Sequence, residues 1–244
     1  MKTEELARLK DLLRGARDIV FLTGAGMSTE SGIPDFRSAQ GLYASGVTEE
    51  VFDIDIFQTR PEVFYGFVRQ YLPVFQAAKP HAGHRAITAL SRRPLTSVTV
   101  ITQNIDTLHQ EAGNPVVLPV HGTLEDSICQ SCGAVTPTET LWGQVEAGKV
   151  PRHHCGGVFK PDIVFYGETL KLEIILAARH RVFAADLLVV CGTSLVVNPA
   201  GILPRGRQPT CKVVVINKGE TWLDDESDLV LREPVGEVLG LVVE

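Results

Sequence analysis

The sequence predicts an α/β fold in which a doubly wound parallel sheet carries a smaller inserted module. Short, nearly continuous apolar runs predict strands that are buried on both faces, as strands are in a parallel sheet. Helical patterns lie between several of these runs, and two other segments interrupt the alternation. The predicted strands are residues 19–22, 98–102, 116–120, 187–191 and 213–216.

The predicted helices follow from leucine spacing and from the segments between strands. Ahead of the first strand, leucines recur at helical spacing and a glycine can end the helix. These residues are Leu6, Leu9, Leu12, Leu13 and Gly15. Further helices are predicted at residues 81–90 and 172–184.

Two segments do not fit this alternation. One is rich in aromatic residues and predicts helix, and the other places Cys129, Cys132 and Cys155 among turn residues. We expect both to be insertions that together form a small domain. The predicted large domain comprises residues 1–38, 80–122 and 161–244, and the small domain comprises residues 39–79 and 123–160.

Composition narrows the class of protein. The chain has 244 residues, of which 44% are hydrophobic, so it can bury a substantial core. A net charge of −6 argues against nucleic-acid binding. No apolar run approaches the roughly 18 residues of a membrane span, and the N-terminus is not typical of a signal peptide. Because five cysteines in this length do not form a disulfide framework, we expect a reducing cytoplasm.

A glycine-containing loop follows the first predicted strand, and residues 23–38 read TGAGMSTESGIPDFRS. The Gly-Ala-Gly at 24–26 places nearly bare backbone N–H groups where phosphate oxygens can approach. Alone, such a loop is more often a tight turn. Thr29 stands where dehydrogenases have a third glycine, and Pro34 cannot lie inside a long helix. The loop therefore favours dinucleotide binding without hydride transfer.

Polar residues directly follow four other predicted strands, and parallel strands present such ends at one edge of the sheet, where ligands bind. Gly192-Thr193-Ser194 and Asn217 can read ribose hydroxyls, or they can be a capped turn and a strand-terminal amide. Asn104 and Asp106 can hold a carboxamide, which needs a donor and an acceptor, or they can cap a following helix. His121 precedes a glycine at a strand end, where a neutral imidazole can accept a proton.

Together these motifs resemble the sirtuins, which are NAD-dependent protein deacylases. The resemblance runs from about residue 18 to residue 230 and rests on four ordered motifs. They are residues 23–38, TQNIDTLHQ at 102–110, His121-Gly122, and Gly192-Thr193-Ser194 with Asn217. It implies a Rossmann-like domain, a small domain with a helical and a zinc-ribbon-like part, and a cleft between them for NAD and substrate.

The resemblance also implies a reaction. An acyl-lysine carbonyl oxygen attacks C1′ of the nicotinamide ribose, nicotinamide leaves, and His121 deprotonates a ribose hydroxyl that attacks the resulting alkylamidate. Asp106 contacts the nicotinamide amide, and Asn104 orients a water beside the ribose. Phe36 covers the reacting centre, and Arg37 contacts NAD oxygens. The expected NAD site is Gly24, Ala25, Gly26, Ser28, Asp35, Phe36, Arg37, Gln103, Asn104, Ile105, Asp106, Gly192, Thr193, Ser194 and Asn217.

Two segments resemble those between which sirtuins bind a peptide by backbone pairing. The expected substrate residues are Val164, Tyr166, Gly167, Glu168, Val196 and Val197. The two valines can equally be core residues. Tyr166 stands where family members usually have phenylalanine. The sirtuins that prefer succinyl-lysine have a tyrosine and, three residues later, an arginine. In this chain the residue three positions after Tyr65 is Val68. We therefore expect a preference for acetyl and other uncharged acyl groups.

The cysteines predict a structural metal site with one irregular position. Cys129 and Cys132 have the spacing of a zinc knuckle, and Cys155 supplies a third thiolate. Arg152 stands where a fourth cysteine would be, so either an adjacent histidine completes the site or the module has lost its metal. Because His154 is next to Cys155 in the chain, we expect His153 to be the fourth ligand.

We therefore expect an NAD-dependent protein lysine deacetylase that acts on acetyl-lysine proteins or peptides. The alternative is an NAD-dependent mono-ADP-ribosyltransferase or NAD glycohydrolase that uses the same ribose-activating site. A catalytically silent NAD- or peptide-binding regulator is disfavoured by Asn104, Asp106 and His121. The oligomeric state and the physiological substrate proteins are not predicted.

Overall fold

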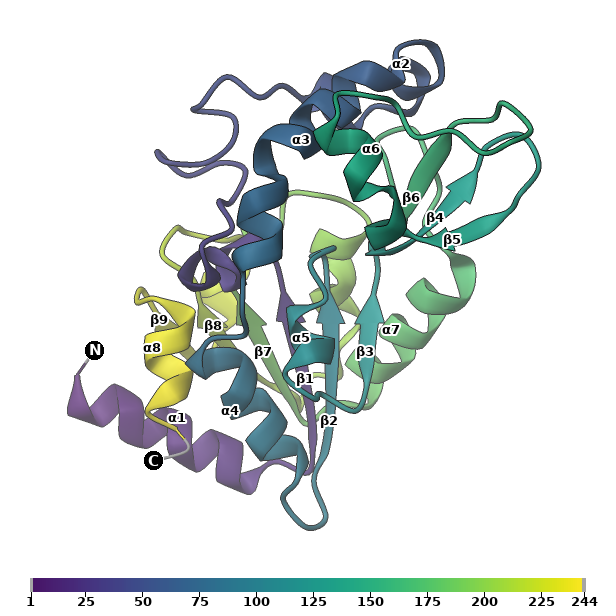
Figure 1. Cartoon of the computed structure of the whole chain (residues 1–244). Coiled ribbons are helices and arrows are strands. Elements are labelled where there is room, and N and C mark those ends of the chain that lie inside the picture. Colours follow the sequence, from purple (N-terminus) through teal and green to yellow (C-terminus); the bar gives the residue numbers. More distant parts are fainter. Residues whose placement is uncertain (1, 243–244) are drawn as a thin grey trace.

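A computed structural model describes residues 2–242, and its largest element is a six-stranded sheet in which every neighbouring pair is parallel (Figure 1). The strand order is β3-β2-β1-β7-β8-β9. The order reverses beside β1, and ligands bind at such a point in open α/β sheets. The strands are β1 (Asp18–Thr23), β2 (Ser97–Thr102), β3 (Val117–Pro119), β7 (Leu187–Cys191), β8 (Lys212–Ile216) and β9 (Leu229–Leu231).

Helices cover both faces of this sheet because successive strand side chains point to opposite faces. Phe21 of β1 packs in the cluster with α1 (Thr3–Gly15), α4 (Ala82–Ser91) and α8 (Val235–Gly240). Val20 and Leu22, its neighbours in the chain, pack in the opposite cluster. That second layer contains α7 (Leu172–Ala184) and the 3-10 helix Ala200–Gly206, and the short helix α5 (Leu108–Glu111) follows β2.

A second, smaller body lies over the carboxyl ends of the parallel strands (Figure 1). Its three-stranded antiparallel sheet has the order β5-β4-β6. An aromatic cluster of Phe57, Phe64, Tyr65, Phe67 and Phe165 forms its core. Its elements are α2 (Ile54–Thr59), α3 (Pro61–Ala77), β4 (Gly122–Cys129), β5 (Val135–Pro137), α6 (Trp142–Glu146) and β6 (Phe159–Ile163).

The α/β prediction is confirmed, and the five predicted strands and the three predicted helices are present within a few residues of their expected ends. The elements β9 and α8 were missed because each is short and has no extended pattern. The aromatic insertion is less helical than expected, since residues 39–48 form turns before α2 and α3. Among the described residues, no helix is both long and apolar enough to cross a membrane.

Candidate active site

A cleft of about 1000 Å³ lies at the carboxyl edge of the parallel sheet, between that sheet and the small body. Its volume is in the range of small-molecule sites. All fifteen residues expected to bind NAD line the cleft, and so does His121. Of the expected substrate residues, only Val196 is not part of the lining, and its side chain is exposed.

The glycines of the first loop serve a purpose different from the one expected. A Cβ on Gly24 would lie 2.7 Å from the Cβ of Thr193, and a Cβ on Gly26 would lie 2.8 Å from the Cα of Gly192. The N–H groups of Gly24 and Gly26 donate to the carbonyls of Cys191 and Gly192. The sequence argument that these N–H groups are left open for phosphate is therefore wrong. The glycines instead allow two loops of the cleft wall to touch.

Ser28, Asn104 and Asp106 form one hydrogen-bonded cluster in the cleft. The Ser28 hydroxyl donates to a carboxylate oxygen of Asp106 and accepts from the Asn104 amide at 3.0 Å. The other Asp106 oxygen accepts from the Leu108 N–H at 3.1 Å, so Asp106 also caps α5, the alternative role weighed above. Burial raises the pKa of Asp106, and the hydrogen bonds from Ser28 and Leu108 oppose that rise. The cluster therefore places hydrogen-bond donors and acceptors at fixed positions in the cleft.

His121 is held in one orientation at the end of β3. Its Nδ1 lies 3.0 Å from the Gln103 carbonyl oxygen, which can only accept, so Nδ1–H donates and Nε2 keeps a lone pair. Burial lowers the pKa of His121 more than the bond to Gln103 raises it. The imidazole is therefore neutral near pH 7 and can accept a proton at Nε2.

Gly122 is needed directly after His121. Its φ is +76°, and a Cβ there would lie 2.0 Å from the Asp162 carbonyl oxygen. The Val164 N–H donates to the His121 carbonyl at 2.8 Å. The backbone of the candidate base is thus packed against the segment expected to bind the substrate.

The polar extension of the glycine loop is ordered by its own side chains. Asp35 accepts hydrogen bonds from the N–H groups of Arg37 and Ser38, so its carboxylate shapes the loop. The Phe36 ring lies 5.8 Å from the rings of both Tyr43 and Phe52. The Arg37 guanidinium lies 5.6 Å from the centre of the Tyr43 ring. The loop therefore presents an aromatic ring and a cation to the cleft.

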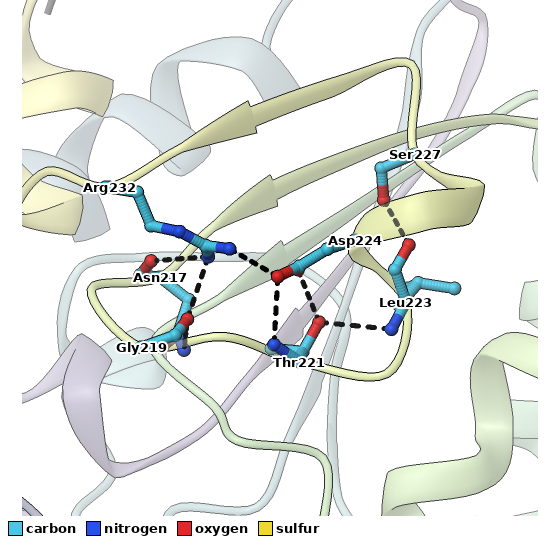
Figure 2. A network of polar contacts seen from close by, with 7 residues as sticks. All are labelled: Asn217, Gly219, Thr221, Leu223, Asp224, Ser227 and Arg232. Carbon is cyan, nitrogen blue, oxygen red and sulfur yellow. Dashed lines mark hydrogen bonds and ion pairs between the residues drawn. The ribbon is translucent and has the colours of Figure 1, made fainter.

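A polar network shapes the other end of the cleft, where β8 ends (Figure 2). Arg232 donates to the carbonyls of Asn217 and Gly219 at 3.1 and 2.8 Å and pairs with Asp224. The Asn217 amide also donates to Gly219. Burial opposes ionisation of Asp224, but the hydrogen bonds from Thr221 and Arg232 outweigh it and lower the pKa of this carboxyl. Gln103 links this side to the centre by donating to Thr193 at 3.0 Å.

One wall of the cleft is apolar, and sequence reasoning did not identify it. Its residues include Phe64, Phe67, Val68, Ile163 and Phe165. Their apolar character could not distinguish a cleft wall from a core, and most of them do belong to the aromatic core. The Tyr65 hydroxyl donates to the Phe159 carbonyl at 2.6 Å, and Tyr65 is not part of the lining.

Four potential metal ligands converge in the small body, away from the cleft. The ligand atoms of Cys129, Cys132, His153 and Cys155 all lie within 4.8 Å of one another. The Cys129 and Cys155 sulfurs are 3.6 Å apart, close to the roughly 3.8 Å that 2.3 Å zinc–sulfur bonds give in a tetrahedron. Arg152 donates to the Gly156 carbonyl in the same hairpin. Three thiols and an imidazole are a donor set that fits structural zinc.

Comparison with known proteins identifies the family. A family model described as the Sir2 family matches residues 24–199. The chain is 43% identical over 231 residues to an NAD-dependent protein deacetylase of Cutibacterium acnes, covering 91% of each chain. It is 40% identical over 236 residues to an NAD-dependent protein deacetylase of Thermotoga maritima, covering 96% of this chain and 95% of the relative.

Solved structures agree with this assignment. A Sir2 structure with a p53 peptide and NAD⁺ has a TM-score of 0.86 and 38% identity, and it covers 98% of this chain and 96% of that chain. A Sir2 variant with a deacetylated p53 peptide and 3′-O-acetyl-ADP-ribose has a TM-score of 0.90 and 39% identity, with coverages of 98% and 97%. By its sequence and by its fold, this chain belongs to the Sir2 family.

Proposed function

We propose that this protein is an NAD-dependent protein lysine deacetylase that acts on acetyl-lysine in proteins or peptides. The observation that carries the proposal is His121, whose Nδ1–H is committed to the Gln103 carbonyl and whose Nε2 is left as an acceptor at the cleft. The family relationship supports the same activity, since relatives that match nearly the whole chain are named NAD-dependent protein deacetylases.

NAD, when bound, supplies a ribose C1′ that becomes electrophilic as nicotinamide is lost. In our proposal Asp106 contacts the nicotinamide amide and Asn104 orients a water beside the ribose, and Ser28 holds both side chains in place by hydrogen bonds. The loop braced by Arg232 holds the adenosine end. Phe36 excludes water from the centre, and Arg37 contacts NAD oxygens. His121 accepts the ribose hydroxyl proton at Nε2.

The acetyl-lysine side chain would enter along the wall that contains Val68 and Phe165, and the peptide would lie between residues 164–168 and 194–198. We propose that Val164, Tyr166, Gly167, Glu168 and Val197 shape this site and that Val196 meets the peptide outside the cleft. The proposed large domain comprises residues 1–38, 80–122 and 161–244, and the small domain comprises residues 39–79 and 123–160. The antiparallel sheet extends beyond the second range, from Gly122 to Ile163.

We further propose that Cys129, Cys132, His153 and Cys155 bind structural zinc, which takes no part in catalysis because it lies outside the cleft. We also propose a reducing cytoplasm as the site of action, because five cysteines in 244 residues do not form a disulfide framework. The net charge of −6 supports a peptide partner over nucleic acid.

Incubation with NAD and an acetyl-lysine peptide, followed by mass analysis of the products, tests the activity. The expected result is free lysine peptide, nicotinamide and O-acetyl-ADP-ribose in equal amounts, with no turnover when NAD is omitted. Free ADP-ribose or ADP-ribosylated protein without deacetylation would instead identify the glycohydrolase or ADP-ribosyltransferase.

A further inference from the structure

Lys160 is a buried lysine beside the substrate end of the cleft. Only 5% of this residue is exposed, and lysine is rarely buried unless it is paired. Its Nζ lies 2.8 Å from a Glu168 carboxylate oxygen and 2.6 Å from the Ile163 carbonyl oxygen. The ammonium also lies 4.3 Å from the centre of the Phe165 ring. It donates as well to the Pro161 carbonyl at 3.5 Å, so three of these four contacts are with residues 163–168, and the two shortest are among them.

Glu168 closes the same segment from its other end. The carboxylate oxygen that pairs with Lys160 also accepts a hydrogen bond from the Phe165 N–H at 2.8 Å. One oxygen of the Glu168 carboxylate is thus held by the protein, while the residue also lines the cleft. Lys160 and Glu168 form a clamp, by which we mean this ion pair with its bonds to Ile163 and Phe165.

The segment of residues 163–168 connects the apolar wall of the cleft with the backbone of His121. Ile163 and Phe165 line the apolar wall of the cleft, and the Val164 N–H between them donates to the His121 carbonyl. The Tyr166 N–H donates to the Phe52 carbonyl at 2.7 Å, which ties the segment to the helical part of the small body. A change in the clamp would therefore move the wall against which acyl-lysine packs.

We propose that Lys160 is a positioning residue for acyl-lysine binding. Its buried ammonium holds residues 163–168 in the shape that receives the substrate, and it does not touch the substrate itself. The inference rests on the proposed deacetylase function. Lys160 is buried while Glu168 is half-buried, so loosening the pair would leave the lysine charge uncompensated in a medium of low polarity.

The test compares variants of the clamp with a matched exposed pair. Lys160→Met removes the ammonium and keeps much of the apolar stem, and Lys160→Arg retains the charge. Glu168→Gln keeps the shape and an acceptor for the Phe165 N–H but removes the negative charge. The control is Lys171→Met, since Lys171 pairs with Asp162 near the same segment but is exposed.

Steady-state kinetics should distinguish an effect on peptide binding from an effect on NAD binding. For Lys160→Met, we expect the peptide KM to rise about tenfold or more while the NAD KM stays within about twofold of the wild-type value. Glu168→Gln should raise the peptide KM about threefold. Lys160→Arg should lie closer to the wild type than Lys160→Met does, and Lys171→Met should match the wild type. Calorimetric titration of the acetyl-lysine peptide should show the same order of affinities.

A purely structural role gives a different result. It would lower the melting temperature and the active fraction, so kcat would fall for all substrates while the peptide KM stayed unchanged, and that outcome overturns the proposal. If Lys160→Met does not fold, Glu168→Gln decides alone by the same criterion. An inactive wild-type enzyme would refute the proposed function, whereas an active wild type with clamp variants of unchanged peptide KM would refute only this inference.

Discussion

At the scale of single residues, the orientation of His121 leads to a prediction about pH. Burial lowers its pKa below the ordinary value of about 6.5. The neutral form is the base, so activity is lost as pH falls through the lowered value and is retained at higher pH. The acid limb of kcat/KM for deacetylation should therefore lie below about pH 6.5. A limb governed by His121 at higher pH would contradict this assignment.

Replacement of the same side chain checks its role. His121→Ala should lower kcat by about 10² to 10⁴, because the positioned base is lost, while the affinity for NAD stays nearly unchanged. Turnover and NAD titration measure the two effects. His180→Ala is the matched control, since His180 is exposed on α7 and should be dispensable. Full activity of His121→Ala would remove His121 from the mechanism.

Asp106 leads to a prediction about nicotinamide. In Asp106→Asn, one of the two acceptors that face Ser28 and Leu108 becomes a donor, so the cluster loses at least one hydrogen bond. Loss of a bond to a charged group amounts to roughly 1.5–3 kcal/mol, which is about 10- to 100-fold in affinity. Inhibition by nicotinamide and its exchange into NAD should weaken accordingly. An unchanged inhibition constant would show that Asp106 does not serve this pocket.

At the scale of elements, α3 leads to a prediction about which acyl groups can bind. Val68 presents an apolar side chain to the cleft, and Arg69, one position further along the helix, is exposed and is not part of the lining. A succinyl carboxylate would therefore be buried against apolar groups without a partner, which is costly. We predict that kcat/KM for acetyl-lysine peptides exceeds that for succinyl-lysine peptides by at least about tenfold. A faster reaction with succinyl-lysine would overturn this prediction.

The cysteine-rich hairpin leads to a prediction about zinc. Purified protein should contain about one zinc per chain, and chelation should lower its melting temperature because metal binding contributes to folding. His153→Ala should lose most of the metal, whereas His154→Ala should keep it, since the imidazole of His153 is the one grouped with the three thiols. Metal analysis after growth in zinc-replete medium provides the measurement. Full metal content in His153→Ala would exclude it as a ligand.

Some helices and strands could be predicted from local sequence patterns, and others could not. The helix Leu172–Ala184 and the strand Leu187–Cys191 were predicted with the bounds that the structure has. Each has a long or continuous apolar pattern within its own residues, so its prediction does not depend on the rest of the fold. The strand Leu229–Leu231 has only three residues, and it exists because it pairs with β8. Its formation depends on a partner far away in the chain, which local patterns do not report.

At the scale of the whole molecule, buried histidines should limit acid stability. His84 and His109 are almost fully buried, and burial lowers their pKa values to about 2 and about 3. In the unfolded chain both titrate near 6.5, so below that pH the unfolded state binds more protons than the folded state. The stabilisation they confer is present above about pH 6.5 and is lost as pH falls from there toward about 3 for His109 and about 2 for His84.

Each buried histidine should contribute up to about 1.4 kcal/mol of lost stability per pH unit in that window. Denaturant unfolding at several pH values measures the slope. In His84→Gln the slope should be smaller by one proton per molecule, whereas His180→Gln, which alters an exposed histidine, should leave it unchanged. An unaltered slope in His84→Gln would show that this side chain is protonated in the folded state.

The sequence alone determined the α/β class, the family resemblance and the residues expected to bind NAD, all of which line the cleft. These features are local, since apolar runs specify buried strands, and residues that directly follow parallel strands share one edge of the sheet. The grouping of His153 with three thiols was also expected, from ligand chemistry and spacing.

Only the tertiary structure decided how the pieces touch. It showed that Gly24 and Gly26 make room for the turn after β7, that Ser28 links Asn104 to Asp106, and that Gln103 orients His121. It also revealed Lys160, whose partner is eight positions away across an irregular segment. Each of these facts depends on distances between segments that are remote along the chain or lack a regular period, and such distances are set by packing of the whole molecule.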